Sequence, residues 1–296
     1  MASWKVFPLA AIFAFLFSVA QAQSRIECNV FSSRILNQPV HYCVLLPADY
    51  DTRNASSRRY PVLYFLHGLG QDERTLFDTG GWNLIEDLRQ QHQIGDFLIV
   101  APEGRRSFYV NSADGKVRYS DFLLQEFMPR IERQYRVLPG RQNRALSGVS
   151  MGGYGTLRLA FAHPELFSSV SAQSAALMTD SPQDLNAAMR SGTSVGRLLG
   201  PVFGDPINIA HWRENSPFVL SKEHEAGLRT LAIYFNCGEK DEYGFEKGAE
   251  ALHRQLLTEG IKHEYHLYPG DHSLTYFVEH MSETLEFNSR AFAGHK

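Results

Sequence analysis

The chain has 296 residues, of which 44% are hydrophobic, and its formal net charge is −3 at pH 7. This hydrophobic fraction is sufficient for a sizeable core, and the length suits one α/β domain with a broad sheet. The mild acidic balance, without any basic run, argues against nucleic acid or an anionic membrane surface as the main partner.

The first 22 residues have the pattern of a signal peptide. Lys5 precedes the apolar stretch "VFPLAAIFAFLFSVA", and Ala20-Gln21-Ala22 is a small-x-small cleavage site. The apolar run is short for a membrane span, so a retained anchor is the less favoured alternative. We therefore expect cleavage after Ala22, one mature domain over residues 23–296, and a secreted or periplasmic location without stable membrane insertion.

Three cysteines, Cys28, Cys43 and Cys237, lie in the mature chain without a CxxC pair, and thus suggest neither a zinc site nor a redox pair. Cys28 and Cys43 lie in two β-like stretches that an exported protein can bridge. A simple hairpin register centred on Asn37-Gln38 does not place them opposite each other, so the sequence leaves this disulfide open. Cys237 ends an apolar strand and is expected to be a small buried hydrophobe.

Strand and helix patterns alternate after an N-terminal pair of strands, "RIECNVFSSRIL" and "VHYCVLLP". "PVLYFLHG" is a continuous apolar run, typical of a strand buried on both faces. Later strands are predicted at "FLIVAP", "ALSGVS", "FSSVSAQSA", "LAIYFNCG" and "HEYHLYPG", with helices between them, one of them bent at Pro129. This order predicts a mostly parallel sheet with helices on both faces, antiparallel strands at the N-terminal edge, and ligands beyond the carboxyl ends of the strands.

Ser150 lies in the motif Gly148-Val149-Ser150-Met151-Gly152, where a predicted strand ends and a helix begins. A sharp turn leaves little room for side chains two positions to either side of the serine. It also lifts the hydroxyl above the sheet, at the N-terminus of a helix. A glycine-rich turn that holds a serine by chance is the alternative. The strand-to-helix position favours a nucleophile elbow.

A serine nucleophile needs a base and an orienting carboxylate, which in this arrangement follow it in the order Asp/Glu, then His. His272 follows the last predicted strand and is the predicted base. The loop after "LAIYFNCG" offers Glu239, Asp241 and Glu242, whereas the side chain of Asp271 points away from the adjacent imidazole. The shorter side chain favours Asp241 because fewer torsions must be fixed. The two glutamates are then expected to be solvated loop charges.

An oxyanion hole needs two backbone N–H groups, which we assign to Met151, directly after the nucleophile, and to Leu69 in "FLHGLG". An ordinary glycine-rich turn is the alternative at Leu69. Further candidates lie near glycine-rich loops or in the long segment after the nucleophile, and packing is the competing interpretation for the aromatic ones. These substrate-binding candidates are Gly68, Trp82, Tyr109, Asn111 and Trp212.

The ordered set "YFLHGLG", "APEG…SFYVNS", "GVSMGGYGTLRLA", "CGEKDEYGF" and "HEYHLYPGDHS" resembles the putative esterase family over nearly all of the mature chain. That family includes esterase D, S-formylglutathione hydrolases, feruloyl and acetyl-xylan esterases, and mycolyltransferases. The resemblance implies an α/β-hydrolase fold, no metal or organic cofactor, and Asp241 as the acid. "HGLGQ" and "GVSMGGYG" depart from the "SGLTC" and "GHSMGGHG" of the glutathione branch, which favours secreted carboxylic-ester hydrolases.

The sequence thus predicts a secreted serine esterase that acts through an acyl-enzyme on short-chain or carbohydrate-linked esters of acetyl or feruloyl type. An acyltransferase of the mycolyltransferase type, an S-formylglutathione hydrolase-like thioesterase and a non-catalytic binding module are the alternatives. Residues 177–230 interrupt the alternation and predict an insertion near the site. Because this insertion looks polar and not amphipathic, we expect short-chain esters to be preferred to long-tailed triglycerides.

Overall fold

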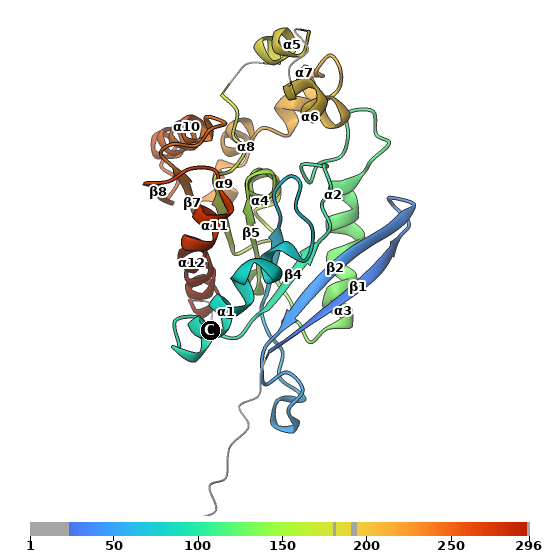
Figure 1. Ribbon diagram of the computed structural model, residues 1–296, viewed down its shortest axis with the longest axis vertical. Coiled ribbons are helices and arrows are strands. Elements are labelled where there is room, and N and C mark those ends of the chain that lie inside the picture. The colour runs from blue at the N-terminus through green and yellow to red at the C-terminus, as the bar shows by residue number, and fades with distance from the viewer. Residues whose placement is uncertain (1–23, 180–181, 191–193, 295–296) are drawn as a thin grey trace, which may run out of the picture.

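The structure, a computed structural model, describes residues 24–179, 182–190 and 194–294, so the predicted signal peptide over residues 1–22 lies outside the described residues. The described strands form one eight-stranded sheet in the order β1-β2-β4-β3-β5-β6-β7-β8. β1 and β2 run antiparallel to their neighbours and the others are parallel, which confirms the predicted α/β-hydrolase sheet (Figure 1). The strands are β1 Arg25–Ser33, β2 Gln38–Leu46, β3 Val62–Leu66, β4 Leu98–Pro102, β5 Arg144–Val149, β6 Ser169–Gln173, β7 Ala232–Gly238 and β8 Glu264–Tyr268.

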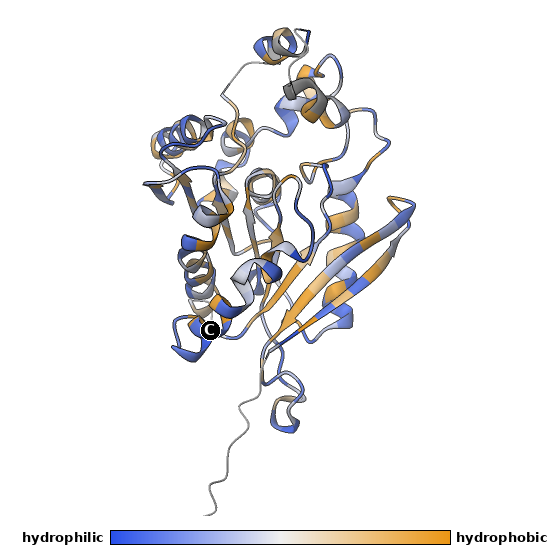
Figure 2. Ribbon diagram, in the orientation of Figure 1, coloured by the Kyte–Doolittle hydropathy of each residue, from blue (hydrophilic) through white to orange (hydrophobic). Residues whose placement is uncertain are grey.

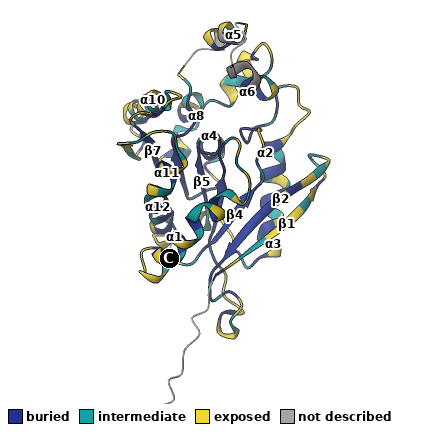
Figure 3. Ribbon diagram, in the orientation of Figure 1, coloured by how far each residue is buried: buried dark blue, intermediate teal, exposed yellow. Residues whose placement is uncertain are grey.

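Helices cover both faces of this sheet because its central strands are apolar on both sides. Every residue of β3, β4 and β6 is buried, and Tyr64 packs into one apolar cluster while its neighbours Leu63 and Phe65 pack into the other. Figure 2 shows β4 as hydrophobic and Figure 3 shows it as buried, between more polar, exposed helix surfaces. One cluster includes residues of α3 (Met128–Gln134), α4 (Met151–Ala162) and α10 (Phe245–Thr258), and the other includes residues of α1 (Trp82–Gln90), α11 (Leu274–Glu279) and α12 (Met281–Ala293).

The helix predicted around Pro129 changes its winding directly before that residue. α2 (Tyr119–Asp121) continues into a π-helical turn, Phe122–Phe127, and then into α3. Proline has no N–H to donate to the preceding turn, so a wider turn before it accommodates the missing hydrogen bond.

The described parts of residues 177–230 contain five helices, and the expectation that this segment is polar and not amphipathic is wrong. They are α5 (Pro182–Arg190), α6 (Ser194–Phe203), α7 (Ile209–Glu214), α8 (Pro217–Glu223) and α9 (Glu225–Leu228). α5 and α6, which we call the cap, are amphipathic, and Leu185 and Leu199 are buried. In the sequence these leucines are scattered among glycine, serine and polar residues, but in the structure α5 contributes Leu185 and α6 contributes Leu199 to the same cavity. The argument for a preference for short acyl chains therefore loses its premise.

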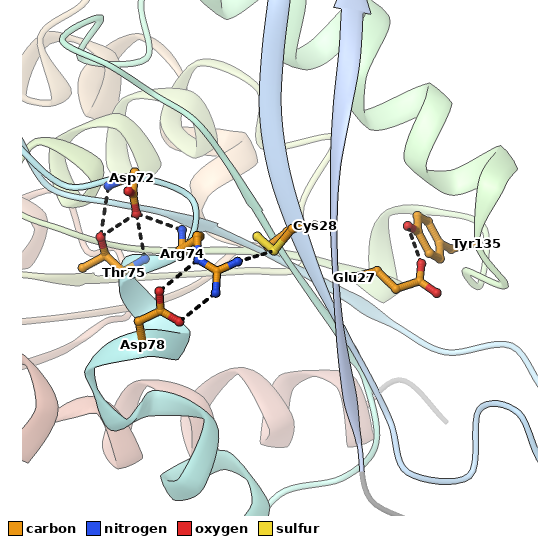
Figure 4. The surroundings of a disulfide bond; sticks show 8 residues. Glu27, Cys28, Asp72, Arg74, Thr75, Asp78 and Tyr135 are labelled. Atoms are coloured by element: carbon orange, nitrogen blue, oxygen red, sulfur yellow. Dashed lines mark hydrogen bonds and ion pairs between the residues drawn. A yellow bond between two sulfur atoms is a disulfide. The ribbon is translucent and has the colours of Figure 1, made fainter.

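Cys28 and Cys43 form a disulfide between the edge strands β1 and β2. The two residues lie directly opposite each other, with Cα atoms 4.1 Å apart, because the hairpin turn is centred between Ile35 and Leu36. The actual turn centre lies two residues before Asn37-Gln38, so the register centred there is wrong and would have paired Cys28 with Pro47. Nη1 of Arg74 donates to Sγ of Cys28 over 3.4 Å, a contact that Figure 4 marks with a dashed line. Cys237 is free and fully buried, as predicted.

We expect reduction of the Cys28–Cys43 disulfide to lower the free energy of unfolding by up to about 3 kcal/mol, because the bond closes a loop with a sequence separation of 15. Urea titrations of the wild type with and without a thiol reductant measure this difference. Cys28→Ala is the control and should show the same stability in both conditions. Equal stability of the oxidised and reduced wild type would contradict the expectation.

Candidate active site

Ser150 occupies a strained turn between β5 and α4, with φ 53° and ψ −117°. The turn packs directly against the end of β3: a Cβ added at Gly152 would lie 1.8 Å from the carbonyl oxygen of Leu66, and one added at Gly148 would lie 2.7 Å from it. Only glycine fits at these two positions. The N–H of Ser150 donates to the carbonyl of Gln173 at the end of β6, 2.9 Å away. The hydroxyl therefore stands at the carboxyl edge of the central strands.

The structure brings the side chains of Ser150, His272 and Asp241 into one hydrogen-bonded chain. Nε2 of His272 lies 2.8 Å from Oγ of Ser150, and its Nδ1 lies 2.6 Å from Oδ2 of Asp241. The Asp241 side chain is fully buried and that of His272 is 8% exposed. Because the carboxylate can only accept, Nδ1 carries the imidazole proton and Nε2 is left to accept from the serine hydroxyl. This arrangement allows a proton to pass from the hydroxyl to Nε2.

The loops after β7 and β8 hold the acid and the base through further hydrogen bonds. Oδ1 of Asp241 accepts from the N–H of Tyr243 over 2.9 Å, and its Oδ2 lies 3.7 Å from the thiol of Cys237. Burial raises the pKa of this thiol to about 12, so it stays neutral and donates its S–H. Glu242 accepts from the backbone N–H of His272 over 2.9 Å. The interpretation of Glu242 as a merely solvated charge is therefore wrong, although its side chain is exposed.

Leu69 and Met151, the predicted oxyanion donors, both lie beside Ser150. Leu69 follows β3 in a loop whose Gly68 would place an added Cβ 3.5 Å from that of Ser150. Met151 is the first residue of α4, and the first N–H groups of a helix have no partner within it. The candidate donors are the backbone N–H groups of these two residues, so their side chains need not contact a substrate carbonyl. Their role as oxyanion donors stays a prediction.

A cavity of about 420 Å³ opens above Ser150 and His272. Its lining includes Met178 and three leucines of the cap, Leu185, Leu198 and Leu199. It also includes Tyr243, Phe245, Leu274 and Phe277. Among the described residues that line it, none is an aspartate, glutamate, lysine or arginine. The cavity therefore suits an uncharged, largely apolar ligand.

Of the predicted substrate-binding residues, only Gly68 lines this cavity. Tyr109 is fully buried, and its hydroxyl donates to the carbonyl of His67 over 3.1 Å. Trp82 begins α1, and its Nε1 donates to Oγ of Ser24 over 3.1 Å. Both aromatic residues thus have packing positions, which corrects their assignment to the cleft.

Asn111 and Trp212 are also engaged elsewhere. Oδ1 of Asn111 accepts from the N–H of Asp121 over 3.1 Å, and Trp212 packs edge-on against Phe203 with 4.8 Å between ring centroids. Sequence reasoning missed instead the cap leucines, Tyr243 and Phe245, which do line the cavity. The position of Tyr243, two residues after the predicted acid, was the available signal.

Within residues 24–179, 182–190 and 194–294, no group of three or more His, Cys, Asp or Glu side chains could hold a metal ion.

Comparisons with known proteins agree with this architecture. An esterase of Mycobacterium tuberculosis is 32% identical over 248 residues, which are 77% of this chain and 51% of that protein, so the chain spans about half the length of this relative. An acetyl esterase of Caldicellulosiruptor saccharolyticus is 23% identical over 264 residues, which are 88% of this chain and 96% of that protein. The solved structure of a ferulic acid esterase superimposes with a TM-score of 0.76 at 25% identity, over 91% of this chain and 99% of that one.

The family model described as "Putative esterase" matches residues 33–287, which include the Ser150 turn and both of the loops that carry Asp241 and His272. The match therefore covers the whole sheet apart from residues 25–32 of β1. This chain belongs to the putative esterase family.

Proposed function

We propose that this protein is a serine carboxylic-ester hydrolase in which Ser150, His272 and Asp241 form the catalytic triad. The observation that carries the proposal is the hydrogen-bonded chain of these side chains, with 2.8 Å from Oγ of Ser150 to Nε2 and 2.6 Å from Nδ1 to Oδ2 of Asp241. A nucleophile, a base and an orienting acid at such distances are the requirement for acyl transfer through serine.

The reaction then proceeds in two halves. Oγ of Ser150 attacks the ester carbonyl as Nε2 of His272 takes the hydroxyl proton, and Asp241 balances the charge of the imidazolium. The N–H groups of Leu69 and Met151 donate to the developing oxyanion. The alcohol leaves with the proton from Nε2, and an acyl-enzyme remains. Water, deprotonated by the same Nε2, then attacks the acyl carbon and releases the acid.

The substrates that the site suits best are uncharged esters of acetyl or feruloyl type, including carbohydrate-linked ones. Support comes from the uncharged cavity lining and from the relatives, which are named acetyl esterase and ferulic acid esterase. A cavity of about 420 Å³ lies within the range of small-molecule sites and has room for more than an acetyl group. A glutathione thioester, with its charged carboxylates and ammonium, lacks a charged partner among the described lining residues.

Ser150→Ala should abolish hydrolysis of p-nitrophenyl acetate, with a fall in kcat of roughly a million-fold, because no other group can form the acyl-enzyme.

Asp241→Asn should lower kcat about ten-thousand-fold, since the imidazole loses the partner that fixes its tautomer. Thermal unfolding of each variant checks that the fold persists. Glu242→Gln is the matched control: it removes a neighbouring carboxylate but keeps an oxygen for the N–H of His272, and it should retain most of the activity. If Asp241→Asn keeps more than about a tenth of wild-type kcat while Glu242→Gln is inactive, the acid has been misassigned.

We further propose that residues 1–22 are a cleaved signal peptide and that the mature protein is exported. The Cys28–Cys43 disulfide supports this proposal, since such bonds persist in oxidising compartments. Among the described helices, none is sufficiently long and apolar to cross a membrane.

Protein recovered from the exported fraction should begin at Gln23, because cleavage follows Ala22. Peptide mapping of the N-terminus, together with the intact mass, measures this start site. An uncleaved chain recovered from the cytoplasm as the only active species would contradict the proposal.

A further inference from the structure

Two aromatic rings flank the base on one side of the cavity. Tyr243 and Phe245 lie with their ring centroids 4.9 Å and 5.4 Å from that of His272, and both line the cavity. The two rings stack on each other at 5.5 Å with 21° between their planes. Tyr243 is nevertheless 68% exposed, which is unusual for a side chain of its size. Its ring therefore offers an open apolar surface next to the base.

The release of the alcohol, in the first half of the reaction, decides which part of the substrate meets this surface. When the tetrahedral intermediate collapses, the bond between the carbonyl carbon and the alcohol oxygen breaks, and the oxygen keeps the electron pair. That oxygen takes the proton which Nε2 of His272 received from Ser150, so it must lie within hydrogen-bond distance of Nε2. A bulky alcohol that starts at this position comes within reach of the rings of Tyr243 and Phe245, which lie beside His272 and line the same cavity.

We propose that Tyr243 and Phe245 form an alcohol subsite that binds a sugar ring through stacking. This inference rests on the proposed esterase function. An exposed aromatic ring at a cavity rim can cover the C–H face of a sugar while the sugar hydroxyls stay in water. The N–H of Tyr243 donates to Oδ1 of Asp241, and this bond fixes the backbone of Tyr243 relative to the acid.

The test compares two esters of the same acid, 6-O-acetyl-glucose and ethyl acetate, by acid release at constant pH. In Tyr243→Ala the ratio of kcat/KM for the sugar ester to that for ethyl acetate should fall about tenfold. Tyr243→Phe should keep the wild-type ratio, because the ring remains. A ratio of rates cancels any effect of the substitution on the steps that both esters share, and either variant retains the backbone N–H that binds Asp241.

Leu257→Ala, which removes a 59% exposed side chain on α10, is the control and should leave the ratio unchanged. An unchanged ratio in Tyr243→Ala would overturn the subsite. p-Nitrophenyl acetate serves as a third ester, and a loss confined to it would also overturn the subsite and would instead indicate an aryl alcohol. Failure of the wild type to hydrolyse any of the three esters would reject the proposed function itself.

A second, independent inference concerns His67, which is fully buried at the end of β3. Its Nε2 lies 2.7 Å from the N–H of Gly104, and its Nδ1 lies 2.8 Å from the carbonyl oxygen of Gly68. Because the backbone N–H of Gly104 can only donate, Nε2 must accept. Nδ1 therefore carries the proton and donates to the Gly68 carbonyl. Burial lowers the pKa of His67, which keeps the ring neutral.

The bond from His67 sets the direction of a neighbouring N–H. The carbonyl of Gly68 and the N–H of Leu69 belong to one planar trans peptide, in which the two groups point in opposite directions. A carbonyl held by Nδ1 of His67 therefore holds the Leu69 N–H as well. The preceding peptide is also fixed, because the N–H of Gly68 donates to Oε1 of Gln71 over 2.8 Å.

We infer that His67 is a positioning residue that acts through the N–H of Leu69, the oxyanion donor of the proposed function. Two amide substitutions separate its two bonds. The side-chain nitrogen of asparagine lies about where Nδ1 does and can still donate to the Gly68 carbonyl. The side-chain oxygen of glutamine lies about where Nε2 does and can still accept from Gly104. Each variant leaves one buried backbone group without its partner, so both should lose similar stability.

Only His67→Gln should lose catalysis out of proportion to stability, with kcat about 100-fold lower and KM little changed, whereas His67→Asn should stay within about tenfold of wild type. Activity is measured per folded molecule, at a temperature where both variants are folded. Equal kcat in the two variants would overturn the role. The wild type provides a check that needs no variant: imidazole nitrogen NMR must show the Nδ1–H tautomer of His67. The Nε2–H tautomer would overturn the inference, whatever the variants do.

Discussion

The close contact between the Ser150 turn and the end of β3 is the constraint on which the candidate site depends. Gly152 passes so near the carbonyl oxygen of Leu66 that a side chain there would overlap it, and Ser150 holds a positive φ as a result of the sharp turn. Such strain persists only where the surroundings over-determine it. Here the parallel pairing of β5 with β3 and β6 supplies those surroundings on both sides. The same contact places the loop of Leu69 next to the serine.

The acid and the base are positioned by a second close approach, between the loops after β7 and β8. The two strands pair in parallel up to Gly238 and Tyr268. Beyond them the N–H of Glu239 donates to the carbonyl of Tyr268, and that of Lys240 donates to the carbonyl of Gly270, over 2.8 Å and 2.9 Å. The loops are therefore joined by backbone hydrogen bonds before their functional side chains meet. The distance between Asp241 and His272 follows from sheet pairing and does not depend on the mobility of two separate loops.

Local patterns predicted those features that depend on local structure. The buried runs, the turn glycines and the strand-to-helix junction were sufficient for the parallel sheet and for placing Ser150 at the end of a strand. The assignments of His272 and Asp241 also used the chain order of a triad, and that of Asp241 used the family resemblance as well. Two features were missed because these patterns do not specify the centre of a hairpin turn or the packing of the cap. The hairpin register was set at the wrong turn, since the sequence signal at Asn37-Gln38 lies beside the actual turn and not at its centre. The cap leucines were overlooked because they lie among polar residues and on two separate helices, α5 and α6, which meet only in the folded chain.

The neighbours of a side chain in space decide what it does. Tyr109, predicted to bind substrate, is buried and bonded to the backbone, whereas His272 lies between Ser150 and Asp241. His67 and His272 illustrate this, because each has both ring nitrogens in hydrogen bonds. The partners of His67 are two backbone groups that never exchange protons, and a second ring proton would face the N–H of Gly104. The partners of His272 are a hydroxyl that can release a proton and a carboxylate that can balance the charge gained. The two histidines thus have opposite surroundings: backbone groups hold His67 in one tautomer, whereas His272 faces the hydroxyl of Ser150 and the carboxylate of Asp241. The difference lies in whether backbone groups or side chains bind the ring nitrogens.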